Sequence, residues 1–199
     1  MPKSVTAATG MDAITHAVES YISNMATPLT EYNSIKGLQI FRENLPKAVA
    51  DGNDMEAREG MAAAALLGGM AFANSGLGAA HGIGMAVGIA YHVPHGEACG
   101  ILLPHVMKLN QKKAEERMAK IGEALTGRRF AKPEEGAQAA VDFILELNAH
   151  MEIKPDFKHL GIPREDIEKL AKASYGTSMS SNPVQLEMDE MIEYISEIV

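Results

Sequence analysis

The sequence lacks the residues that stabilise small secreted proteins and those that bind nucleic acid. Its one cysteine, Cys99, cannot form a disulfide within the chain. It has no tryptophan, only 5% aromatic residues and a net charge of −8. The one basic cluster, Arg128-Arg129, is too short to follow a phosphate backbone. We therefore expect neither a disulfide-stabilised fold nor binding to nucleic acid.

Long hydrophobic runs and a signal peptide are also missing. The longest apolar run, residues 61–73, is shorter than the roughly 18 residues that cross a bilayer. The N-terminus has no basic segment followed by an apolar one. We expect a cytoplasmic protein with no membrane partner, in which residues 61–73 form a buried helix.

The sequence is rich in small apolar residues, glycine and alanine, and in the flexible residue methionine. The 199 residues include 18 glycines and 13 methionines, and alanine is abundant. Such residues suit helices that approach one another closely, with thioethers filling the gaps between them. No useful alternation of apolar and polar residues predicts a strand. The sequence predicts an all-α helical bundle in which residues 1–199 form a single domain.

Capping residues and breakers predict the helix boundaries. Thr27 followed by Pro28 is typical of a helix start, Asp54 is expected to cap the next helix, and Pro46 should kink or end the helix between them. The helices that we expect span about residues 6–23, 28–45, 54–72, 97–110, 114–125, 133–150, 164–174 and 188–198.

The segment 74–97 is the most unusual part of the sequence. Its glycines make it a poor isolated helix, since each interior glycine costs about 0.5–1 kcal/mol relative to alanine. Close approach of the backbone to a partner helix or ligand would offset that cost. Val93-Pro94 interrupts the chain just before His95, so we expect His95 to lie at the entrance of the following helix.

Four side chains in two stretches form a candidate metal site. Asp12 and His16 stand four residues apart on the first expected helix, so they share a face. His81 and His95 lie fourteen residues apart within the glycine-rich segment. One carboxylate and three imidazoles suit a divalent transition metal. From the residues alone, histidines satisfied by hydrogen bonds in the core are an equally good interpretation.

Three stretches occur in the order and spacing of one known family. They are TAATGMDAITHAVESYIS at 6–23, HGIGMAVGIAYHVPHGEACGILLPHVMKLN at 81–110 and SSNP at 180–183. They resemble the iron-containing (group III) alcohol dehydrogenases, in the helical C-terminal domain of the dehydroquinate synthase-like fold. The resemblance covers nearly the whole chain. It implies that Asp12, His16, His81 and His95 hold Fe²⁺, or Zn²⁺ in some members.

The resemblance also implies a reaction and its partners. The metal would polarise the oxygen of a small alcohol or aldehyde, while NAD or NADP exchanges hydride with the carbon. In the family a nucleotide-binding α/β domain precedes the helical one, and these residues contain no such domain. We therefore expect NAD or NADP only together with that domain, which a separate nucleotide-binding chain could supply, and we expect a homo-oligomer.

Residues around the ligands give further expectations. Many family members carry a second histidine four residues after the one matching His81, where this sequence has Met85. A thioether cannot relay a proton, so the relay would fall to His92 or to water. Phe72 and Met85 are expected to line the substrate pocket, although Phe72 equally suits the core. Cys99 is expected to be a small core residue.

Two alternatives to this function remain open. One is a non-catalytic helical domain that binds metal or mediates dimerisation. The other is half of a metalloenzyme similar to glycerol dehydrogenase or dehydroquinate synthase, which share the architecture but use fewer metal ligands. Four ligands favour the iron-containing group.

Overall fold

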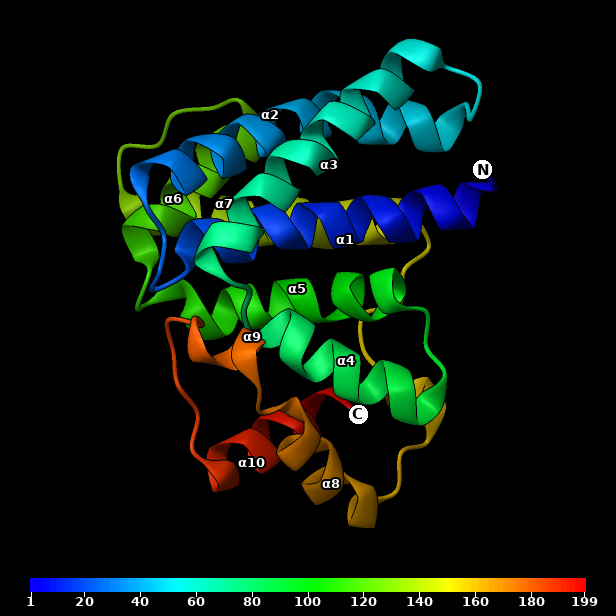
Figure 1. The fold of residues 1–199 in the computed structure, drawn as a ribbon, viewed down its shortest axis with the longest axis vertical. Coiled ribbons are helices and arrows are strands. Elements are labelled where there is room, and N and C mark those ends of the chain that lie inside the picture. The colour runs from blue at the N-terminus through cyan, green and yellow to red at the C-terminus, as the bar shows by residue number, and fades with distance from the viewer.

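The computed structural model describes all 199 residues as helices joined by turns and contains no strand, which confirms the all-α fold (Figure 1). The elements in chain order are α1 (Lys3–Ile22), α2 (Pro28–Ala50), α3 (Met55–Ser75), α4 (Ala79–Tyr91), α5 (His95–Gln111), α6 (Glu115–Thr126), α7 (Pro133–His150), the 3₁₀ turn η1 (Lys158–Leu160), α8 (Arg164–Ser174), α9 (Thr177–Ser180) and α10 (Met188–Ile198).

The predicted caps are confirmed and the break at Pro46 is not. Thr27 and Thr30 form a reciprocal capping box at the start of α2, and the Asp54 side chain accepts a hydrogen bond from the Ala57 amide. The prediction that Pro46 could end α2 is wrong, because the helix continues to Ala50. The flanking residues Leu45 and Val49 are buried, so tertiary packing holds the last turn despite the lost amide.

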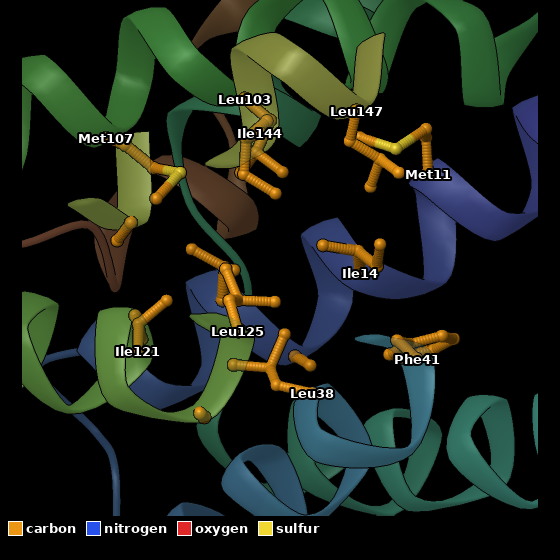
Figure 2. Close-up of a cluster of buried hydrophobic side chains, with 14 of the residues drawn as sticks. Met11, Ile14, Leu38, Phe41, Leu103, Met107, Ile121, Leu125, Ile144 and Leu147 are labelled. Atoms are coloured by element: carbon orange, nitrogen blue, oxygen red, sulfur yellow. The ribbon is translucent and has the colours of Figure 1, made fainter. Parts of the chain in front are cut away.

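Two apolar cores lie on opposite sides of helix α5, which contributes buried residues to both, and α1 belongs to the larger one (Figure 1). The larger core contains 26 buried residues, and Figure 2 shows part of it, with labelled residues from α1, α2, α5, α6 and α7. The smaller core contains 17 buried residues from α4, α5, α8, α9 and α10, together with Phe157 just before η1. Helix α1 belongs to the larger core and α4 to the smaller one, so residues that join α1 to α4 lie at the boundary between the two cores.

Helix α3 is less buried than the sequence suggested. Its inner face, with Ala64, Gly68 and Ala71, packs on α1 and α2. Leu66 and Met70 on the opposite face are 64% and 43% exposed, so the expectation of a buried helix at 61–73 is wrong for that face. No single helix meets the length and hydropathy needed to cross a bilayer, and the pair α3 and α4 meets them only across a bend of 101°.

Candidate metal centre

The four predicted ligands come from three helices that meet at the boundary between the cores. Asp12 and His16 lie on one face of α1, His81 lies in the first turn of α4, and His95 is the first residue of α5, as the sequence predicted. Glycine permits this approach. A Cβ atom at Gly96 would overlap the carbonyl oxygen of Ala8 in α1, so the start of α5 can lie directly against α1.

A single carboxylate oxygen is surrounded by the three imidazoles. Asp12 Oδ1 lies 3.7 Å from His16 Nε2, 3.3 Å from His81 Nε2 and 3.4 Å from His95 Nε2. The cluster is closed on one side and open on the other, since the His81 side chain is 5% exposed and that of His95 is 41% exposed. The structure therefore brings the three histidines to one oxygen of Asp12, at a position with access from solvent.

Two atoms of this cluster are buried without a hydrogen-bond partner. They are Asp12 Oδ1 and His81 Nε2, which face each other. A buried polar atom without a partner costs about 1–3 kcal/mol, so such atoms are rare in folded proteins unless they have a function. The donor set of one carboxylate and three imidazoles also suits a divalent cation. These residues fit a metal ion.

Aromatic stacking fixes the ring of His16. Its centroid lies 4.5 Å from that of Phe72 and 4.7 Å from that of His81, and both pairs are stacked. Phe72 therefore borders the cluster from α3. Met85, also expected at the substrate pocket, is 53% exposed on α4. His92, the predicted proton relay, is an exposed residue in the left-handed conformation that ends α4.

The sequence analysis missed the role of Glu19, the most completely bonded side chain in the site. Its Oε2 lies 2.6 Å from His81 Nδ1 and accepts a hydrogen bond from the Gly78 amide at 3.0 Å. Its Oε1 accepts a bond from the Ala80 amide at 2.7 Å. The spacing of Asp12, His16 and Glu19 places all three on one helix face, and that pattern could have identified Glu19.

The electrostatics of the cluster favour a positive charge. Burial disfavours charged His81, but its interactions with Asp12, Cys99 and Glu19 outweigh burial and raise the pKa of His81 to about 12. Burial and neighbouring histidines lower the pKa of His16 to about 4 despite the attraction of Asp12. The carboxylates of Asp12 and Glu19 thus favour the protonated, positively charged form of His81. A metal cation bound at the same place would supply the positive charge in place of that proton.

Cys99 is buried, as expected, but it lies at the cluster rather than in a core. Its Sγ is 3.6 Å from His95 Nε2, one helical turn away. The donor atoms of Cys99, Asp12, His81 and His95 all lie within 4.8 Å of one another. Burial raises the pKa of the Cys99 thiol, which favours its neutral form.

Comparisons with known proteins agree with this geometry. The family model described as "Fe-containing alcohol dehydrogenase family, C-terminal" matches residues 6–199. Alcohol dehydrogenase 4 of Saccharomyces cerevisiae is 37% identical over 198 residues, which are 98% of this chain and 50% of the yeast protein. NAD-dependent methanol dehydrogenase of Bacillus methanolicus is 38% identical over 199 residues, covering 98% of this chain and 51% of that protein.

The structural comparison gives the same result. A crystal structure of 1,3-propanediol oxidoreductase superimposes on the whole chain with a TM-score of 0.95 and 35% identity, over 53% of that protein. The chain thus spans about half the length of the relatives that it matches. Its helices, its site and its sequence agree with a single assignment: the chain belongs to the iron-containing alcohol dehydrogenase family, as the helical C-terminal part.

Proposed function

We propose that this chain provides the metal-binding half of an NAD(P)-linked alcohol dehydrogenase that acts on small alcohols or aldehydes. The observation that carries the proposal is the cluster in which three imidazole nitrogens surround the buried, unpartnered Oδ1 of Asp12. The names of the relatives support the reaction class, since they include methanol, butanol and 1,3-propanediol dehydrogenases.

The spacing of the donor atoms supports one shared ion. Ligand atoms about 2.0–2.2 Å from a metal in tetrahedral geometry stand about 3.3–3.6 Å apart. The distances from Asp12 Oδ1 to the three histidine nitrogens run from 3.3 to 3.7 Å. We assign Asp12, His16, His81 and His95 as ligands of Fe²⁺ or Zn²⁺.

Each residue of the site has a separate part in this function. When bound, the cation supplies a Lewis acid that polarises the substrate oxygen. Asp12 offsets one of its two charges, and Phe72 both stiffens His16 and gives the open side an apolar wall. Met85 offers no titratable group, so we assign proton transfer to His92 or to water.

The nicotinamide cofactor needs residues beyond these helices. Dinucleotides bind where a strand, a glycine-rich loop and a helix meet, and the 199 residues contain no strand. Relatives about twice as long are named for both NAD and NADPH. We propose that NAD or NADP binds only when a nucleotide-binding domain faces the open side of the cluster.

A non-catalytic role in assembly is the second candidate. The exposed apolar residues of α3 and α4, namely Leu66, Met70, Met85 and Ile89, favour it because apolar helix faces commonly lie in interfaces. Such a domain could bind metal without supporting turnover.

The test separates the two candidates in two steps. Protein purified without oxygen is analysed for metals and titrated by calorimetry with NADH and NADPH. We expect one Fe²⁺ or Zn²⁺ per chain and no micromolar binding of either nucleotide. The chain is then combined with the nucleotide-binding half of a relative, and alcohol-dependent reduction of NAD⁺ or NADP⁺ is measured. Metal without turnover would favour the assembly role, and the absence of metal would contradict the catalytic proposal.

A further inference from the structure

We propose that Glu19 is a positioning residue for the metal centre: it binds the Nδ1 proton of His81 and thereby directs the Nε2 lone pair of that ring at the metal. The inference rests on the proposed metal-binding function and deepens it. Glu19 is not itself assigned as a ligand, because its partner is the nitrogen of the His81 ring that faces away from the other ligands.

The partners of the Glu19 carboxylate determine which nitrogen of His81 carries the proton. The Gly78 and Ala80 amides can only donate, and an ionised carboxylate can only accept. His81 Nδ1, 2.6 Å from Oε2, must therefore be the donor. In a neutral imidazole the other nitrogen then carries the lone pair, and this nitrogen is Nε2, beside Asp12.

Tautomer and ring direction both matter for a metal ligand. A histidine that binds a metal through one nitrogen usually donates its other N–H to a carboxylate or a carbonyl, which fixes the ring and increases its basicity. Glu19 meets that description from a side chain that is fully buried. His81 is the only one of the three histidines for which Glu19 can do this, because Glu19 makes no hydrogen bond to His16 or His95.

The same carboxylate joins two elements that carry ligands. Glu19 lies on α1 with Asp12 and His16, and its bonds to the Gly78 and Ala80 amides hold the first turn of α4, which carries His81. The backbone approaches so closely that a Cβ at Gly78 would lie 2.7 Å from Glu19 Oε1. The position of His81 relative to α1 therefore depends directly on Glu19.

A simpler explanation is that Glu19 only caps the start of α4, and the chain offers a matched control for it. Asn182 Oδ1 accepts a hydrogen bond from the Ala79 amide at 3.2 Å, so it caps the same turn without contacting a histidine. Asn182 is also buried, and it bonds Asn110 and the Val184 carbonyl. Its loss should lower stability without changing the His81 tautomer.

The first test compares Glu19→Gln with Asn182→Ala in the full chain, with Zn²⁺ as the probe. The glutamine amide can be oriented in two ways, and in each its NH₂ group faces a backbone N–H, which is also a donor. In one of the two, the NH₂ group also faces His81 Nδ1, so the proton of the neutral ring must move to Nε2. We expect the substitution to lower Zn²⁺ affinity about 10–100-fold, the range for partners of metal-bound histidines. Asn182→Ala should lower the melting temperature but leave Zn²⁺ affinity of the folded protein unchanged.

The second test needs no substitution, so it holds even where a variant fails to fold. In ¹⁵N NMR of the Zn²⁺-loaded chain, His81 should show a proton on Nδ1 and none on Nε2. Zinc bound through Nδ1, or equal loss of affinity in the two variants, would overturn the role of Glu19 while leaving metal binding intact. A chain that binds no Zn²⁺ would instead overturn the proposed function and this inference with it.

Discussion

Helix α1 has two faces, and they belong to two different kinds of structure. One face places Met11, Ile14 and Val18 among the apolar side chains of the larger core, of which Figure 2 labels Met11 and Ile14. The other face presents Asp12 and His16 to α4 and α5, where buried polar atoms remain without partners. The core face is complete without a ligand, since dispersion and burial need nothing further. We propose that a cation bound by these donors satisfies the polar face.

The largest expected effect is the loss of metal affinity when a ligand on the polar face of α1 is substituted. Asp12→Ala removes the one charged ligand, and if four ligands share about 10–16 kcal/mol of zinc binding, each contributes roughly 10²–10³-fold. We expect Zn²⁺ affinity to fall by about that factor, measured by competition with a chromophoric chelator.

The matched control for Asp12→Ala is Asp142→Ala, which removes the same charge from the exposed surface of α7. It should leave Zn²⁺ affinity unchanged. A similar loss of affinity in both variants would mean that net charge, rather than coordination, governs binding.

A substitution in the core that the other face of α1 packs into should lower stability rather than metal affinity. Leu38 is fully buried in the larger core, so Leu38→Ala should lower the free energy of unfolding by about 2–5 kcal/mol, measured by urea denaturation. Zn²⁺ affinity of the folded variant should not change. If it falls together with stability, the two faces of α1 are not independent and the comparison fails.

The smallest expected effect concerns the stacking of Phe72 on His16. Phe72→Leu keeps an apolar side chain but loses the ring pair, which is worth about 0.5–1.5 kcal/mol. We expect Zn²⁺ affinity to decrease about two- to tenfold. Phe143→Leu, on a residue packed against the larger core, should have no such effect and serves as the control. Equal behaviour of the two variants would show that Phe72 is an ordinary core residue.

The sequence was sufficient for most of the fold because the helix signals are local. The helices at 133–150, 164–174 and 188–198 begin and end as predicted, and the caps at Thr27 and Asp54 form the expected bonds. The helix continues past Pro46 because its neighbours pack against distant residues, and such packing is not a local signal. The exposed face of α3 could not be foreseen either, since its alanines and methionines suit a core and a surface equally well.

The candidate site was predictable to a different extent for each of its residues. Residue type and spacing indicated all four candidate ligands, as one pair on the first helix and one pair in the glycine-rich segment, and the family resemblance then implied that they hold Fe²⁺ or Zn²⁺. Spacing alone could have placed Glu19 on the face of α1 that carries Asp12 and His16, but its three hydrogen bonds could not be predicted, because they depend on how α1 meets α4. Cys99 was expected in the core, and its position beside His95 likewise follows from the start of α5 rather than from composition.

The most direct test of the central claim is X-ray absorption spectroscopy of the chain loaded with one equivalent of Zn²⁺. The account predicts a nitrogen and oxygen shell at about 2.0–2.2 Å, multiple scattering from three imidazoles, and no sulfur neighbour. A sulfur neighbour at about 2.3 Å, or fewer than three imidazoles, would contradict it and indicate that Cys99 replaces a histidine in the ligand set.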